Sequence, residues 1–116
     1  MASTGTKIED LSLSLNRLQN ELQDTVSNRQ RLETQFQENK IVKAEFDKLG
    51  DEAKIYKLVG PILLPQDNTE ANMNVDKRLE FIEDEIKRCE AKIETTQTEI
   101  QTKSMELNAL RTGVAA

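Results

Sequence analysis

Apolar residues recur at alternating spacings of three and four positions along both halves of the chain. With Ile8 at heptad position a, the first series of a and d residues is Ile8, Leu11, Leu15, Leu18, Leu22, Thr25, Arg29, Leu32, Phe36, Asn39, Lys43 and Phe46. The second series is Val75, Leu79, Ile82, Ile86, Cys89, Ile93, Thr96, Ile100, Lys103, Leu107, Leu110 and Val114. A 3.5-residue repeat of this length predicts two coiled-coil helices, which we place at residues 7–49 and 75–112.

The pattern changes between these two helices, where apolar residues become dense and a Gly60-Pro61 pair interrupts them. β-branched and aromatic residues on both sides of a Gly-Pro break predict two short strands and a turn, so we assign a β-hairpin to residues 53–66. A lone two-stranded hairpin is only marginally stable in water. We therefore expect partner chains to add strands to its edges.

The connector is much shorter than either helix, and both apolar seams have to be buried. We therefore expect the helices to fold back on each other, with Phe46 near Leu79 and Ile8 near Leu110. The predicted fold is mainly α, a single domain over residues 1–116 built as a long antiparallel two-helix coiled coil. The β-hairpin lies at one tip, where we expect partner chains to extend it, and both termini lie at the other tip.

Composition narrows the classes of function. Hydrophobic residues make up 36% of the chain and charged residues 32%, which is typical of a long amphipathic helical protein. The net charge of -5 has its basic residues interspersed among acidic ones, so we expect neither nucleic acid nor membrane as a partner. We see no secretory signal, and the single cysteine, Cys89, fits a reducing compartment, so we expect a cytoplasmic location.

The sequence contains few of the residue types that catalysis commonly uses. The chain has no histidine and one cysteine, so Ser-His and Cys-His schemes are excluded, and no metal-ligand or phosphate-binding spacing occurs. Cys89 falls on a d position and is better explained as a small seam residue than as a nucleophile. We predict no enzyme activity, no catalytic or metal-binding residues and no cofactor.

Apolar residues gather at the free ends of the two helices: Leu11, Leu13, Leu15, Met105, Leu107 and Leu110. Leu13 and Met105 occupy f positions, away from the seam. Isolated exposed apolar residues are normal on protein surfaces. Alternatively, these residues form a binding surface for variable partners, for which Met and Leu are suited. Off-seam Ile41, Val42 and Phe81, near the other end, pack under the hairpin or against a neighbouring subunit.

Three segments carry a resemblance to a known family. IYKLVGPILL, NVDKRLEFIEDEIKRCE and RQRLETQFQENKIVKAEFDKL resemble the β-class subunits of prefoldin, and the resemblance covers roughly residues 19–110. It implies a heterohexamer of two α-class and four β-class subunits whose hairpins join into a β-barrel. It also implies an ATP-independent chaperone that captures unfolded proteins, notably actin and tubulin, at its coiled-coil tips and passes them to the cytosolic chaperonin.

The resemblance also implies roles for individual residues. The residues expected to mediate subunit assembly are Ile55, Tyr56, Leu58, Val59, Ile62, Leu63 and Leu64. The residues expected to contact clients are Leu11, Leu13, Leu15, Met105, Leu107 and Leu110. The expected partners are other prefoldin α- and β-class subunits, unfolded clients and the chaperonin. The alternative is a structural coiled coil that tethers partners without protecting clients.

Overall fold

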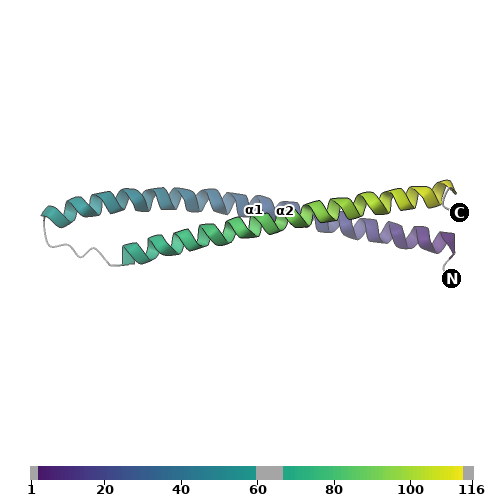
Figure 1. Cartoon of the computed structure of the whole chain (residues 1–116), viewed down its shortest axis with the longest axis horizontal. Coiled ribbons are helices and arrows are strands. Elements are labelled where there is room, and N and C mark those ends of the chain that lie inside the picture. The colour runs from purple at the N-terminus through teal and green to yellow at the C-terminus, as the bar shows by residue number, and fades with distance from the viewer. Residues whose placement is uncertain (1–2, 60–66, 114–116) are drawn as a thin grey trace. The chain divides into compact units, whose positions relative to one another are not determined.

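The computed structural model describes residues 3–59 and 67–113, with side chains described for residues 3–48 and 72–113. These residues form two helices, α1 (Thr4–Val59) and α2 (Asp67–Thr112) (Figure 1). None of the described helices is long and apolar enough to cross a membrane. The prediction of two long helices, made from the heptads, is confirmed.

The outer end of each helix carries a cap. The hydroxyl Oγ of Ser3 accepts a hydrogen bond from the backbone N–H of Thr6 at 3.2 Å, so Ser3 is the N-cap of α1. At the end of α2, Gly113 has a φ of 73°, a left-handed conformation that glycine adopts without a steric penalty. Its N–H bonds to the carbonyl oxygen of Leu110 at 3.3 Å, so the helix ends where the sequence places a glycine.

The chain divides into two compact units, each made of one segment from each helix. Unit 1 comprises Met1–Arg29 and Arg88–Ala116, and unit 2 comprises Gln30–Lys87. Within unit 1 the helices are antiparallel, because Leu11 lies beside Leu110 while Arg29 pairs with Glu90. Within unit 2, Lys43 of α1 pairs with Asp76 of α2.

The seam of unit 1 follows the predicted heptad. Each a and d residue from Ile8 to Arg29 and from Cys89 to Leu110 is buried or half-buried, and Leu15, Cys89 and Leu107 are among the buried apolar residues. Thr25 and Thr96 are also buried at seam positions. The Thr25 hydroxyl donates to the carbonyl oxygen of Glu21 at 2.8 Å, which satisfies this polar group inside the helix.

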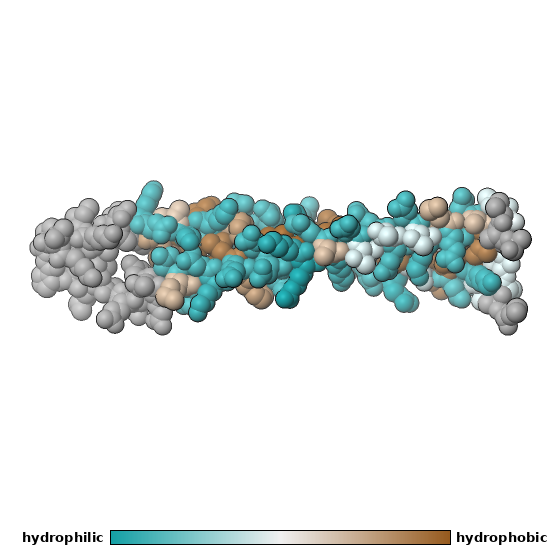
Figure 2. Space-filling model, in the orientation of Figure 1, coloured by the Kyte–Doolittle hydropathy of each residue, from teal (hydrophilic) through white to brown (hydrophobic). Residues whose placement is uncertain are grey.

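The seam of unit 2 is equally regular. Val75, Ile82 and Ile86 are buried, and the a and d residues from Leu32 to Phe46 are half-buried. Figure 2 shows hydrophilic side chains over most of the coloured surface, with apolar side chains between them. Each unit is therefore a coiled-coil segment with a narrow apolar seam and charged outer faces.

The structure differs from the expected hairpin over the first part of the connector. α1 continues through Gly50 to Val59, so the backbone of residues 53–59 is helical, and no strand occurs among residues 3–59 and 67–113. A helix satisfies its hydrogen bonds within one segment, whereas a hairpin needs further strands for stability. The rest of the predicted hairpin, residues 60–66, lies outside the described residues, and the hairpin stays a prediction.

The start of α2 also differs from the expected boundary. The sequence analysis begins the second helix at residue 75, whereas α2 begins at Asp67 in the structure. From residue 67 to residue 74 the chain contains neither Pro nor Gly, and the helix extends backwards from the first seam residue without interruption.

Candidate functional site

The outer end of unit 1 contains an open pocket between α1 and α2. Its volume is about 410 Å³, and we call it the tip pocket. The residues that line it are Lys7, Asp10, Leu11, Ser14, Glu106, Ala109 and Leu110. Four come from α1 and three from α2, so the pocket exists only where the two helices lie together.

Heptad geometry explains why these residues meet. Leu11 and Leu110 occupy d positions of the seam, while the other five occupy c and g positions, which lie on one flank of the coiled coil. Leu11 and Leu110 are half-buried, so part of each side chain is open to the pocket. The pocket is therefore the open end of the apolar seam with one flank as its wall.

The six predicted client-contact residues fall into three groups. Leu11 and Leu110 line the tip pocket. Leu15 and Leu107 are buried within the seam, where they hold the helices together. Leu13 and Met105 lie on the surface, with exposed fractions of 58% and 67%. The structure thus places four of the six where a bound chain can reach them, and contact with a client stays a prediction.

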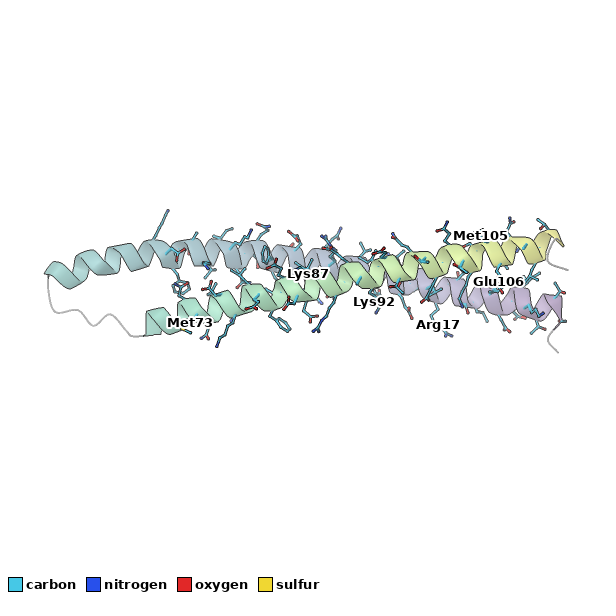
Figure 3. The ribbon with its side chains drawn as sticks, viewed as in Figure 1. Arg17, Met73, Lys87, Lys92, Met105 and Glu106 are labelled. Carbon is cyan, nitrogen blue, oxygen red and sulfur yellow. The ribbon has the colours of Figure 1, made fainter. Side chains whose placement is uncertain are left out.

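The two exposed residues lie next to the pocket wall. In Figure 3, Met105 extends from the outer side of α2, whereas Glu106 lies on the side of α2 that faces α1. Met105 precedes the pocket residue Ala109 by four positions, and Leu13 follows Asp10 by three, so each is a helical neighbour of the wall. Apolar surface therefore continues outwards from the pocket on both helices.

The sequence analysis missed the wall of this pocket, which is mostly polar. Lys7, Asp10, Ser14, Glu106 and Ala109 were not singled out, although each lines the tip pocket. The signal that identifies them is their c or g position beside Leu11 and Leu110, and it becomes readable only when the register between the two helices is known.

The inner end of unit 1 is polar. The amide Nδ2 of Asn28 donates a hydrogen bond to the Sγ of buried Cys89 at 3.6 Å. Next to it, the guanidinium of Arg29 pairs with the carboxylate of Glu90 at 3.2 Å. Cys89 is thus a small buried seam residue, as the heptad indicates. Among the described residues, no group of three His, Cys, Asp or Glu side chains is arranged to hold a metal ion.

The predicted assembly residues lie in a different part of the chain. The backbone at Ile55, Tyr56, Leu58 and Val59 is the last part of α1, and their side chains lie outside the described set. Residues 62–64 lie outside the described residues altogether. Their role in assembly stays a prediction.

Unit 2 carries its own exposed apolar residues. Ile41 and Phe81 are each 62% exposed and Met73 is 54% exposed, while Val42 is exposed to a smaller extent. The sequence analysis identified three of these as residues that the seam does not need, but it overlooked Met73.

Comparisons with known proteins agree with this architecture. A family described as "Prefoldin subunit" matches residues 9–113. The chain is 49% identical over 109 residues to prefoldin subunit 6 of Saccharomyces cerevisiae, an alignment that covers 94% of this chain and 96% of that protein. It is 45% identical over 100 residues to the probable prefoldin subunit 6 of Caenorhabditis briggsae, with coverages of 86% and 75%. No solved structure matches the chain significantly.

The fold and the comparisons together define a subunit of a chaperone family that is built on a coiled coil. The family match covers almost the whole chain, and the yeast relative is similar over nearly its full length. The chain belongs to the prefoldin subunit family.

Proposed function

We propose that this chain acts in the cytoplasm as one subunit of a heterohexameric, ATP-independent chaperone. It captures unfolded proteins, including actin and tubulin, at the ends of its coiled coils and delivers them to the cytosolic chaperonin. The observation that carries the proposal is the tip pocket with exposed Leu13 and Met105 beside it, in a chain of the prefoldin family.

The physical chemistry of capture requires no reaction at this site. A protein that binds the unfolded state and not the folded state holds a client by mass action alone. Each tip offers a small apolar surface and binds weakly, but several tips on one body raise the effective concentration of each site. Flexible Met and Leu side chains accept many different apolar partners. These properties suit a chaperone that receives clients of different sequence.

Assembly is the task that we propose for the connector. Residues 53–66 form a β-hairpin when neighbouring subunits supply further strands, and the hairpins then close into a barrel. The dense apolar sequence of this stretch, which a two-helix seam does not require, supports the proposal. In the single chain, the helical backbone of residues 53–59 satisfies its hydrogen bonds without partners, and assembly replaces this arrangement.

The rival function is a structural coiled coil that tethers partners. A tether depends on its assembly segment but tolerates polar substitutions at its tips, because it does not hold unfolded chains. The two functions therefore differ in the consequence of altering Leu13 and Met105.

The deciding experiment measures protection of a client. The chain is assembled with its partner subunits, denatured actin is diluted into the complex, and aggregation is followed by light scattering. We expect Leu13→Ser combined with Met105→Ser to raise the aggregated fraction about twofold, because one of several tips is lost. Val26→Ser is the control, since Val26 is also an exposed apolar residue but does not line the tip pocket. Unchanged protection by the double variant would favour the tether.

A second experiment tests the assembly segment. The chain is used as bait in cytosol, intact or with Leu58, Ile62 and Leu64 changed to Ser. We expect the intact chain to recover other small coiled-coil subunits and the variant to lose them. Equal recovery by both chains would place assembly in the helices instead.

A further inference from the structure

The tip pocket has a chemical character beyond its apolar floor. Besides Leu11 and Leu110, it is lined by the carboxylates of Asp10 and Glu106 and by one cation, Lys7. A ligand that fills this pocket therefore meets apolar surface and negative charge together. The charges around the pocket determine which unfolded segments fit it best.

Negative charge is concentrated on the flank of unit 1 that forms the pocket wall. We call this the acidic flank, the c and g positions of residues 7–24 and 94–111. Its carboxylates are Asp10, Glu21, Asp24, Glu99 and Glu106, and its cations are Lys7 and Arg17. All seven side chains are exposed. The acidic flank therefore has an excess of three negative charges beside the pocket.

The opposite flank lacks this excess. Over the same residues, its b and e positions carry two carboxylates, Glu9 and Glu94, and one cation, Arg111. Of the five e positions, which lie nearest the seam on this flank, four are uncharged (Ser12, Gln19, Gln97 and Ser104) and the fifth is Arg111. The two flanks share the same helices and the same seam, so the difference between them is a property of the pocket side.

Two glutamates on the acidic flank face each other across the seam. The contacts of Asn28 with Cys89 and of Arg29 with Glu90 fix the register of unit 1. One heptad further out, this register sets Glu21 beside Thr96 and Leu22 beside Gln97, so Glu21 and Glu99 are the g residues that flank the same stretch of the seam. Coiled coils usually place opposite charges at such facing positions, and like charges there are destabilising. The fold therefore does not need this arrangement.

The same carboxylates are free to meet a cation from outside. Among the described side chains, no ion pair is formed by Asp10, Glu21, Glu99 or Glu106. The seam residue Lys103, which lies between Glu99 and Glu106 in the sequence, does not pair with either of them. A cationic side chain bound here gains attraction from several carboxylates at once.

We propose that the tip pocket binds extended client segments in which apolar side chains alternate with lysine or arginine. This inference rests on the proposed client-capture function and names the class of segment that this tip prefers. In an extended chain, side chains two positions apart share a face, so apolar residues enter the pocket from one face. The intervening basic residues then extend towards the acidic flank.

The test uses the assembled complex and a reporter confined to this tip. A photo-cross-linking amino acid replaces Thr102, which lies between Glu99 and Glu106 on the acidic flank, or Ser104 on the opposite flank. Both residues are exposed, so they form a matched pair. The probes are two labelled peptides with the same apolar residues, one with lysines and one with glutamates at the intervening positions.

We expect the lysine peptide to cross-link at residue 102 about fivefold more than the glutamate peptide at low salt. The ratio should fall towards one at high salt and in a Glu99→Gln, Glu106→Gln variant. A Glu9→Gln, Glu94→Gln variant, which is altered on the opposite flank, should keep the ratio of the wild-type complex. Equal cross-linking of both peptides by the wild-type complex would overturn the charge preference while leaving client capture intact.

Failure of the proposed function gives a different result. In that case neither peptide cross-links at residue 102, and the complex does not protect denatured actin. Cross-links at residue 102 between two complexes without any peptide would identify a second complex as the occupant and would also overturn the proposal.

Discussion

Unit 1 and unit 2 share one heptad pattern, and both expose apolar residues off the seam, but only in unit 1 do the described residues include a pocket that opens onto the seam itself. In unit 1, the seam itself opens at its end, so Leu11 and Leu110 belong both to the seam and to the tip pocket. In unit 2, the exposed apolar residues Ile41, Met73 and Phe81 lie off the seam. Pocket residues therefore combine stability with binding, whereas off-seam residues are not required for the coiled coil.

The largest expected effect is on the free energy of unfolding, and it distinguishes a seam residue from a surface residue within unit 2. Ile82 is 4% exposed, and we expect Ile82→Ala to lower the free energy of unfolding by about 2–5 kcal/mol, because it removes buried methyl groups and leaves a cavity. Its neighbour Phe81 is the matched control, since Phe81→Ala removes a larger but exposed side chain and should change stability by about 0.5 kcal/mol or less. Urea unfolding followed by circular dichroism measures both. Equal losses would mean that Phe81 is covered by a partner.

The next effect separates the two kinds of tip residue in unit 1. Leu110→Ala should cost about 1 kcal/mol of stability, because the half-buried side chain contributes part of its transfer free energy. It should also weaken client protection. Met105→Ala should weaken protection with little change in unfolding, because Met105 lies outside the seam. Urea unfolding and the actin aggregation assay measure the two properties. A Met105→Ala variant that unfolds more easily would place this residue in the packing of unit 1.

A smaller effect concerns the facing glutamates of the acidic flank. We expect Glu99→Lys to stabilise unit 1 by about 0.5 kcal/mol at low salt, because it replaces a repulsion with Glu21 by an attraction. Glu94→Lys makes the same charge change on the opposite flank and should have a weaker effect. Thermal unfolding at low and high salt distinguishes them, since the gain from Glu99→Lys should fade as salt is added. Equal gains from both would show that only net charge matters.

The fold of the described residues follows closely from sequence, and the site follows only in part. The alternation of three and four specifies which residues are buried, and it does so even at polar positions such as Thr25 and Thr96. The tip pocket requires the register between two helices, which depends on contacts between residues 61 positions apart, such as Asn28 with Cys89. Single-helix patterns therefore identify Leu11 and Leu110 but not the wall formed by Asp10 and Glu106.

The connector shows why local pattern is weaker evidence for strands than for these helices. The β-branched residues of 53–59 fit a strand only if other strands lie beside it, since strand stability comes from neighbours. A helix needs no such neighbours for its hydrogen bonds, and α1 continues to Val59. The strand that we propose for this segment needs neighbouring chains, which the sequence of one chain does not contain.

The smallest expected effect is on the stability that an ion pair contributes at alkaline pH, and it should differ between the pairs of the two units. The pKa of Lys43 is raised mainly because its ammonium donates a hydrogen bond to the carboxylate of Asp76. Because the pKa of Lys43 is raised on folding, the ion pair makes its full contribution to the stability of the folded chain at pH values below the unfolded-state pKa of about 10.4. This contribution is lost as the pH rises through the folded-state pKa. The stability difference between the wild type and Asp76→Asn should therefore be constant from about pH 8 to pH 10 and then disappear.

Unit 1 provides the control for this titration. Its corresponding pair, Arg29 with Glu90, uses a guanidinium in place of an ammonium. The stability difference between the wild type and Glu90→Gln should therefore persist at the alkaline pH values at which the difference between the wild type and Asp76→Asn is lost. Urea midpoints at increasing pH measure both differences. Both differences are small, because the pairs are partly exposed to solvent. Parallel loss of both would mean that the whole chain, and not Lys43, responds to alkaline pH.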